Sequence, residues 1–343
     1  MNKKIKILQG NCIDKIKELE DNSIDCVVSS PPYFGLRDYG VDEQFGLEKT
    51  YQDYLANTVK VFETFKPKLK DTATIWWNVG DSYNSTNGFC RNKGKYKRPG
   101  RDGGSNNKKL FKDNVIKEKD LLMIPNRVAI ALQDAGWYIR SEIIWHKPNP
   151  MPESVKDRPT SCHEKIWLIT KNKKYYYDHE AIKEPITDTT AIRLLQKNID
   201  NQKGSSRANG GMKSNGNMKA MGRKKFDKNM GGSGTSFVDH SGYKKADGTY
   251  MINPTKNKRN VWTVTTKPFK GSHFATFPKD LIEPCIKAGC PEDGIVLDPF
   301  GGAGTTGIVA SLNNRNSILI ELNPEYIKLA KDRIEKELGL FNG

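Results

Sequence analysis

The sequence predicts an α/β protein, built on a parallel or mixed β-sheet that helices cover on both faces. Short apolar, β-branched runs alternate along the chain with segments of helical periodicity. In addition, two short motifs, residues 30–33 and 298–306, each follow such a run and precede a turn. Each motif therefore lies at the carboxyl end of a parallel strand, where open α/β sheets place their ligands.

The amino-terminal half supplies the first predicted elements. Residues 5–9 alternate and end at Gly10, which is typical of a strand. Ile13, Ile16 and Leu19 share one face of a short helix. By the same patterns we expect further strands at residues 25–29, 73–79, 138–145 and 164–170, and helices at residues 51–66 and 120–135.

Regular patterns return after residue 260. A helix over 277–288 accommodates Pro278 in its first turn, where a backbone N–H has no intrahelical partner. We also expect strands at residues 294–298 and 317–321, and helices at residues 304–313 and 324–338.

Charge is distributed unevenly. The chain of 343 residues can hold one large α/β domain with an insertion, or two domains. Its net charge is +16, yet residues 85–119 carry a net +8 and residues 193–260 a net +11, so the remainder is slightly acidic. Ten of the 30 glycines fall in residues 201–250. Clustered positive charge favours a polyanion partner such as nucleic acid. The alternative is a pair of flexible, solvated loops.

Several other classes are disfavoured. The six cysteines, at positions 12, 26, 90, 162, 285 and 290, form no Cys-x-x-Cys pair. We expect reduced thiols, as in a cytoplasmic protein. Cys162-His163 has no second pair at zinc-site spacing, so no metal site is expected. No segment reads as a signal peptide or reaches the roughly 20 apolar residues of a membrane span.

The carboxyl-terminal motif suits a nucleoside cofactor. A buried strand over 295–297 ends in Asp298, and the glycines that follow let a ligand approach the backbone before a helix begins. The next predicted strand ends in Glu321, whose carboxylate can accept both hydroxyls of a ribose. No Gly-Lys-Ser/Thr follows, which excludes a phosphate-binding P-loop. The alternative is a tight strand–helix turn beside a surface glutamate.

The amino-terminal motif, Ser30-Pro31-Pro32-Tyr33, suits an exocyclic amine on a nucleobase. The lone pair of such an amine is delocalised into the ring, and two fixed acceptors can draw the nitrogen toward a nucleophilic geometry. The hydroxyl of Ser30 and the carbonyl of Pro31 could be those acceptors, because the prolines hold the turn rigidly. Tyr33 offers a ring face to a base extruded from a duplex. Alternatively, the two prolines simply end a strand and Tyr33 packs in the core.

Together these motifs resemble the DNA amino-methyltransferases, which modify N6 of adenine or N4 of cytosine with S-adenosylmethionine. The order, catalytic motif first and cofactor motif last, resembles the beta class of that family. The resemblance covers residues 5–83, 120–185 and 259–338. It implies a Rossmann-like S-adenosylmethionine-dependent methyltransferase fold, circularly permuted, with basic insertions. The serine at position 30 resembles the cytosine-N4 enzymes more than the adenine enzymes.

The resemblance also assigns roles, residue by residue. As cofactor-binding residues it implies Asn11, Cys12, Phe277, Asp298, Pro299, Phe300, Gly302, Gly304, Thr305, Thr306 and Glu321. Residues 274–278 resemble the segment that packs on the methionine end of the cofactor. As catalytic residues it implies Ser30, Pro31, Pro32 and Tyr33, and as residues of the DNA and base pocket His146, Lys147 and Arg158. Alternatively, His146 is an ordinary histidine at the end of a strand, and Lys147 and Arg158 are solvated surface charges. Trp145 and Trp262 are suited to packing in the core.

The expected organisation has three parts. Residues 1–185 form the catalytic half with a basic loop at 85–119, residues 186–258 a target-recognition insertion, and residues 259–343 the cofactor half. Double-stranded DNA is the expected partner of a monomer or homodimer in a bacterial or phage-encoded restriction-modification system, with a cognate endonuclease as a further partner. Alternatives are an N6-adenine enzyme, an RNA or protein-amide methyltransferase, and a catalytically silent DNA-binding relative. The motif and the charge disfavour a dinucleotide oxidoreductase.

Overall fold

The computed structural model describes residues 4–36, 41, 44–84, 115–187, 242–244, 250–252, 254–266 and 277–339. The chain divides into two compact units, one of Met1–Ala181 with Arg259–Gly343 and one of Ile182–Lys258. Most of the basic segments, 85–119 and 193–260, and residues 274–276 lie outside the described residues.

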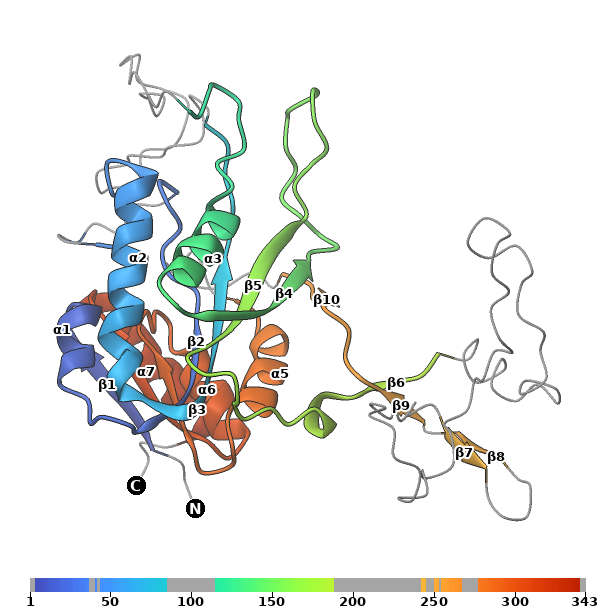
Figure 1. The fold of residues 1–343 in the computed structure, drawn as a ribbon. Coiled ribbons are helices and arrows are strands. Elements are labelled where there is room, and N and C mark those ends of the chain that lie inside the picture. The colour runs from blue at the N-terminus through green and yellow to red at the C-terminus, as the bar shows by residue number, and fades with distance from the viewer. Residues whose placement is uncertain are drawn as a thin grey trace, which may run out of the picture. The chain divides into compact units, whose positions relative to one another are not determined.

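The larger unit contains an eight-stranded sheet in the order β1-β12-β11-β2-β3-β5-β4-β10 (Figure 1). Among the described strands of this sheet, only β5 runs antiparallel to its neighbours, β3 and β4, so the sheet is mixed. The strands are β1 Ile5–Gln9, β2 Ile24–Ser29, β3 Leu69–Val79, β4 Tyr138–His146, β5 His163–Thr170, β10 Val261–Thr263, β11 Ile295–Asp298 and β12 Asn316–Glu321.

Helices cover both faces of this sheet. Helices α1, α2 and α3 pack in one row, and α5, α6 and α7 in another. Neighbouring residues of β12 show the two faces, because Ile320 packs in the core beneath the first row while Leu319 packs against Ile308 and Ile334 of the second. The helices are α1 Cys12–Lys17, α2 Tyr51–Phe65, α3 Ile124–Asp134, α5 Lys279–Gly289, α6 Thr305–Leu312 and α7 Pro324–Leu338, with short 3₁₀ helices η1 Lys66–Lys68 and η2 Glu180–Ile182.

The predicted α/β class and the order of its elements are confirmed, with shifts at some boundaries. The helix predicted over 120–135 begins only at Ile124, because Met123 has a left-handed backbone (φ 59°) and Pro125 occupies the first turn. Strand β10 was not predicted, since only Trp262 of its three residues is buried. β10 pairs in parallel with β4 and extends the sheet at that edge.

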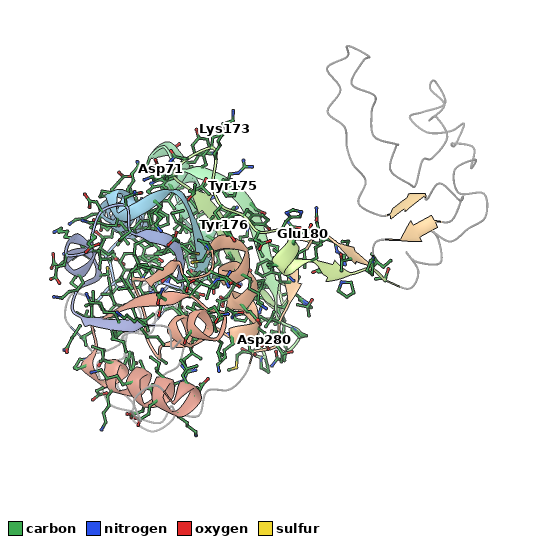
Figure 2. The ribbon with its side chains drawn as sticks, turned by 90° about the horizontal axis from the view of Figure 1, so that it is seen from below. Asp71, Lys173, Tyr175, Tyr176, Glu180 and Asp280 are labelled. Atoms are coloured by element: carbon green, nitrogen blue, oxygen red, sulfur yellow. The ribbon has the colours of Figure 1, made fainter. Side chains whose placement is uncertain are left out.

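At the end of the sheet opposite the two motifs, the chain that follows β5 contacts the first residues of β3. Tyr176 N donates to Thr72 O at 2.8 Å, and Lys171 pairs with Asp71 at 3.1 Å. Figure 2 labels Tyr176 and Asp71. These contacts fix the end of β5 beside the beginning of β3. As a result, the other end of β5 is held beside the carboxyl end of β3, where the motifs lie.

The smaller unit, described by itself, has two short antiparallel pairs. β6 Glu184–Pro185 pairs with β9 Thr255–Lys256, and β7 Gly242–Lys244 pairs with β8 Tyr250–Ile252. Across all described residues of both units, no helix has the length and apolar character needed to span a membrane.

Candidate active site

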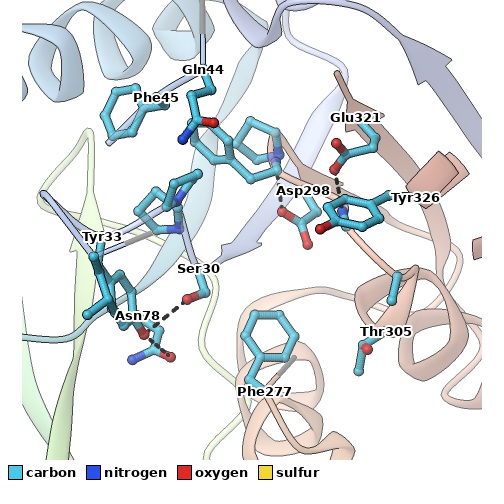
Figure 3. A pocket seen from close by; sticks show the side chains of 18 of the residues that line it. Ser30, Tyr33, Gln44, Phe45, Asn78, Phe277, Asp298, Thr305, Glu321 and Tyr326 are labelled. Atoms are coloured by element: carbon cyan, nitrogen blue, oxygen red, sulfur yellow. Dashed lines mark hydrogen bonds between the residues drawn. The ribbon is translucent and has the colours of Figure 1, made fainter. Parts of the chain in front are cut away.

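The two motifs meet at one cavity. β2 and β11 are parallel neighbours, so the turns that follow them, at Ser30 and Pro299, open on the same edge. A cavity of about 910 Å³ lies there (Figure 3). Its lining includes the predicted residues Asn11, Cys12, Ser30, Pro31, Pro32, Tyr33, Lys147, Phe277, Asp298, Pro299, Phe300, Gly302, Thr305, Thr306 and Glu321.

Asp298 is the most buried carboxylate of the cavity, with 2% of its surface exposed. Ser29 Oγ donates to one carboxylate oxygen and Thr306 Oγ1 to the other, each at 2.6 Å. Phe300 N adds a third hydrogen bond at 3.1 Å. Burial nevertheless raises the pKa of Asp298 above its ordinary value, because desolvation outweighs these hydrogen bonds. A cationic ligand group would relieve that penalty.

Glu321 is held by the backbone on both sides. Gly302 N donates to its Oε2 and Asn323 N to its Oε1, both at 2.8 Å. Gly302 reaches this position with a left-handed backbone (φ 48°). Each carboxylate oxygen keeps a lone pair for a further donor. Burial also raises the pKa of Glu321.

Aromatic side chains make up part of the cavity lining. The Phe300 ring lies 5.3 Å from that of Phe45 and 6.0 Å from that of Trp77. Phe277 and Tyr326 also line the cavity (Figure 3). Sequence reasoning missed Phe45 and Tyr326, since neither lies in a motif.

Asn11 and Cys12 both line the cavity. The side-chain oxygen of Asn11 accepts from Ile13 N at 2.9 Å and caps α1. Burial raises the pKa of the Cys12 thiol to about 12. The thiol is therefore protonated at neutral pH and is no candidate nucleophile.

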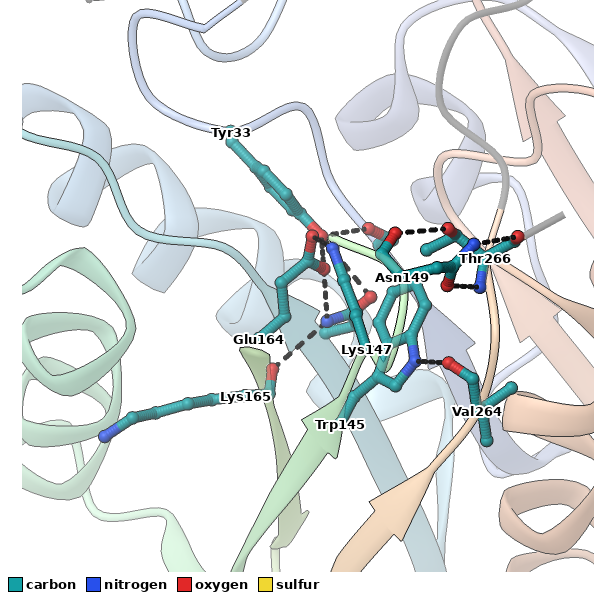
Figure 4. A network of polar contacts seen from close by, with 10 residues as sticks. Tyr33, Trp145, Lys147, Asn149, Glu164, Lys165, Val264 and Thr266 are labelled. Atoms are coloured by element: carbon teal, nitrogen blue, oxygen red, sulfur yellow. Dashed lines mark hydrogen bonds and ion pairs between the residues drawn. The ribbon is translucent and has the colours of Figure 1, made fainter. Parts of the chain in front are cut away.

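Tyr33 is the centre of a polar network at the end of the cavity that Ser30 lines (Figure 4). Its hydroxyl donates to Glu164 Oε2 at 2.6 Å and accepts from Ser30 Oγ at 3.2 Å. Gly80 lies against the ring so closely that a Cβ there would sit 2.5 Å from Tyr33 Cε2. Burial, followed by the charge of Glu164, raises the pKa of Tyr33 well above 10.0. The phenol thus remains protonated.

Lys147 joins this network and His146 does not. Lys147 Nζ pairs with Glu164 Oε1 and lies 4.3 Å from the centre of the Trp145 ring. His146, the next residue back along the chain, has its Nδ1 3.2 Å from Thr263 Oγ1 of β10 instead. It does not line the cavity, because adjacent residues of an extended chain point to opposite faces.

Arg158 and Gly304 also lie outside the lining of the cavity. The guanidinium of Arg158 stacks 3.8 Å from the centre of the Tyr83 ring and donates to Glu153 at 2.5 Å. Gly304 instead supports the fold, since it caps α6 with a φ of 78° and packs against Ala330.

Glu164 and Asn78 are polar lining residues that sequence reasoning did not single out. Asn78 had a usable signal, because a polar residue near the carboxyl end of a buried parallel strand faces the ligand edge. Glu164 begins a predicted strand, and its nearness to Tyr33 depends on the antiparallel pairing of β5 with β3.

Comparison with known proteins agrees with this geometry. The DNA methylase family of N6/N4 type matches residues 24–332. The type II methyltransferase M.Cfr9I of Citrobacter freundii is 38% identical over 96% of this chain and 88% of its own length. M.SmaI of Serratia marcescens is 39% identical over 96% of this chain and 90% of its own length.

Two solved structures share the fold. PvuII DNA methyltransferase, described as cytosine-N4-specific, superimposes with a TM-score of 0.58 at 16% identity, covering 100% of this chain and 93% of its own. The protein TTHA0409 of Thermus thermophilus, solved with S-adenosyl-L-methionine, gives 0.56 at 18% identity, covering 98% and 95%.

The fold is that of the Rossmann-like methyltransferases, with β2, the strand that leads to Ser30, ahead in the chain of β11, the strand that ends in Asp298. More particularly, the chain belongs to the N6/N4 family of DNA methylases, whose relatives here are type II methyltransferases of restriction-modification systems. This family depends on S-adenosylmethionine.

Proposed function

We propose that this protein methylates N4 of a cytosine at a specific site in duplex DNA, after the base has turned out of the helix into the cavity. The observation that carries the proposal is the position of Ser30. Its hydroxyl lines the same cavity as Asp298 and Glu321, at the end where Tyr33 presents its ring. A base beside Tyr33 and a cofactor beside Glu321 would meet between the two turns.

The residues at the cofactor end suit S-adenosylmethionine, which supplies an electrophilic methyl group when it is bound. Glu321 has lone pairs free to accept the ribose hydroxyls, and Asp298 provides negative charge for the ammonium group. Phe277, Phe300 and Tyr326 offer apolar surface. Gly302 lines the cavity and has no side chain, so the backbone there would not obstruct the ligand.

At the base end, Ser30 Oγ and the Pro31 carbonyl would accept hydrogen bonds from the target amine. This arrangement favours a pyramidal nitrogen whose lone pair points toward the methyl group. The turn is held from behind, because Tyr54 donates from its hydroxyl to Pro32 O at 3.2 Å. Preorganised acceptors of this kind need no rearrangement during the reaction.

The choice of base rests on Ser30 itself. Serine in the first position of the motif resembles the cytosine-N4 enzymes, and the N6-adenine reaction is the second candidate. A neutral hydroxyl can accept a hydrogen bond from N4 of cytosine or from N6 of adenine. The choice of base can therefore be wrong while the proposed methyl transfer is right.

We further propose that DNA docks through the basic segments. Lysines and arginines of 186–258 would hold phosphates, while its Asn, Gln and Arg side chains read base edges, and the 85–119 loop would contact the backbone. An endonuclease cutting the same sequence would be the natural partner of such an enzyme. His146 and Arg158, which do not line the cavity, are candidate DNA contacts rather than base-pocket residues.

The test is mass spectrometry of nucleosides from unmethylated plasmid DNA after incubation with the protein and S-adenosylmethionine. N4-methylcytosine is the expected product. N6-methyladenine would refute the base assignment and keep the methyl-transfer mechanism. No methylated nucleoside, with cofactor binding intact, would refute DNA methylation and move the search to RNA or protein amides, or to a silent DNA-binding role.

A further inference from the structure

We infer that Glu164 is a positioning residue that turns the Ser30 hydroxyl into an obligatory hydrogen-bond acceptor, acting through Tyr33. The inference rests on the proposed function, since it concerns the amine that Ser30 would receive. It concerns a carboxylate that lies outside both sequence motifs and comes from a different strand, β5.

Glu164 is itself held in place by its neighbours. Its side chain is 15% exposed, and its Oε1 pairs with Lys147. Its Oε2 accepts from Asn78 Nδ2 at 3.2 Å as well as from Tyr33. A carboxylate paired with a lysine has no proton to donate, so it is the acceptor in every hydrogen bond that it makes.

Asn78 also contacts Tyr33, and the orientation of its amide determines the direction of that hydrogen bond. Its amide nitrogen donates to Glu164 Oε2 and to Lys165 O, both at 3.2 Å. The amide is therefore oriented with its oxygen toward Tyr33, at 3.3 Å. Since that oxygen can only accept, Asn78 cannot donate to the phenol.

These contacts determine the direction of the hydrogen bonds that Tyr33 and Ser30 make. A phenol has a single proton, and the 2.6 Å contact with Glu164 Oε2 is the shorter of the two acceptor contacts that it makes. The phenol oxygen is then left to accept from Ser30 Oγ at 3.2 Å. The serine proton points to Tyr33, and the serine lone pairs remain for the cavity.

This direction matters for the chemistry. A serine hydroxyl that donated to the target amine would bind its lone pair, which is the pair needed for attack on the methyl group. A hydroxyl that accepts leaves the pair free and favours a pyramidal nitrogen. The carboxylate thus decides which of two roles an otherwise ambiguous hydroxyl takes.

The test combines Glu164→Gln and Tyr33→Phe, singly and together, with Glu142→Gln as the matched control. Glu142 also pairs with a lysine, Lys165, but lies on β4 outside the cavity lining. In single-turnover methylation of DNA, we expect Glu164→Gln to slow methyl transfer roughly 10- to 100-fold, with unchanged affinity for S-adenosylmethionine. The double variant should be no slower than Tyr33→Phe alone.

A second readout needs no activity. In protein labelled with ¹³C at the tyrosine ζ carbon, the Tyr33 resonance is assigned by its loss in Tyr33→Phe. In the wild type it should remain that of the protonated phenol at pH 10.0, the ordinary pKa of tyrosine. Glu164→Gln should make it titrate at lower pH, whereas Glu142→Gln should not.

An unchanged Tyr33 titration in Glu164→Gln, or additive rate losses in the double variant, would overturn the role of Glu164. A wild-type protein that transfers no methyl group to DNA would refute the proposed function instead, and the tyrosine titration would still establish whether Glu164 holds Tyr33.

Discussion

Asp298 shows how the burial of a single carboxylate makes the folded protein less stable at neutral pH. Two hydroxyls and one backbone N–H surround it, yet its pKa is raised by burial. A raised pKa in the folded state means that folding favours the protonated form. Its contribution to stability is fully present below the unfolded value of 3.8 and is lost as the pH rises through the higher folded value.

Asp298→Asn should therefore separate stability from binding. Relative to the wild type, the ligand-free variant should gain free energy of unfolding as the pH rises from about 4 to 7, because it has no carboxylate to ionise. Its affinity for S-adenosylmethionine should fall at least about tenfold. Denaturant unfolding across pH and titration calorimetry measure the two effects. Parallel pH profiles for both proteins would contradict the first claim, and Asp134→Asn, at the exposed end of α3, is the control.

Gly80→Ala should damage the base end while sparing the cofactor end. The new Cβ would lie 2.5 Å from Tyr33 Cε2, so the ring has to move away from its hydrogen bonds. We expect the rate of methyl transfer to fall about tenfold or more, at unchanged affinity for S-adenosylmethionine. Gly136→Ala has no neighbour within 4 Å of the added Cβ but adds backbone strain at a φ of 86°, so it controls for a loss of stability without the contact at Tyr33. An equal loss of activity in both variants would argue against this contact.

Tyr33→Ala and Asp298→Ala should fail in different ways. The first removes the ring and its hydroxyl from the base end, and the second removes the charge from the cofactor end. Titration calorimetry should show that S-adenosylmethionine still binds Tyr33→Ala and binds Asp298→Ala weakly. The opposite pattern would reverse the assignment of the two ends of the cavity.

At the scale of elements, the predicted strands could be read from the sequence because a sheet covered on both faces gives near-continuous apolar runs. β2 is buried along its whole length, and β3 along its last seven residues. Edge strands lack this signal, which is why β10, with Val261 and Thr263 exposed, went unpredicted. The motifs were readable for a related reason, since each one directly follows a buried strand.

The polar partners of the motifs could not be read in the same way. Glu164 reaches Tyr33 only because β5 pairs antiparallel with β3, and no local pattern encodes that neighbour. His146 and Lys147 were predicted together, but the alternation of an extended chain places only Lys147 at the cavity. A motif predicts which residues follow one strand at the carboxyl end of the sheet. The residues that approach it from other strands depend on how the strands pair.

Gly304→Ala should weaken the packing of α6 on α7. Gly304 has a φ of 78°, and a Cβ there would lie 3.1 Å from Ala330 Cβ. We expect a loss of about 1–3 kcal/mol in the free energy of unfolding, from backbone strain and contact together. Gly339→Ala is the matched control, because its φ is 63° but no atom lies within 4 Å of the added Cβ. If denaturant unfolding showed equal losses of free energy in the two variants, backbone strain alone would explain the loss and the contact with Ala330 would contribute nothing.

At the scale of the whole molecule, the uneven charge predicts how DNA binding depends on salt. Replacing four lysines of the insertion by glutamine should reduce the slope of log affinity against log salt by about 0.9 for each phosphate that is no longer neutralised. The lysines are Lys213, Lys219, Lys224 and Lys225. The same number of changes at exposed lysines of the larger unit, namely Lys17, Lys60, Lys328 and Lys331, should leave the slope nearly unchanged. Fluorescence anisotropy over a salt series measures both, and equal slopes in the two variants would contradict a localised docking surface.

The adjacency of β2 and β11 also constrains how the protein is made. These strands are neighbours in the sheet although Ser29 and Asp298 are 269 positions apart in the chain. A ribosome delivers the first strand long before the second, so the nascent chain carries β2 without the neighbour that completes its pairing. The sheet can close only after most of the chain has emerged, which makes folding slow and exposes apolar edges meanwhile. An incomplete chain that ends before β11 would also lack Asp298 and the rest of the cavity lining that follows it.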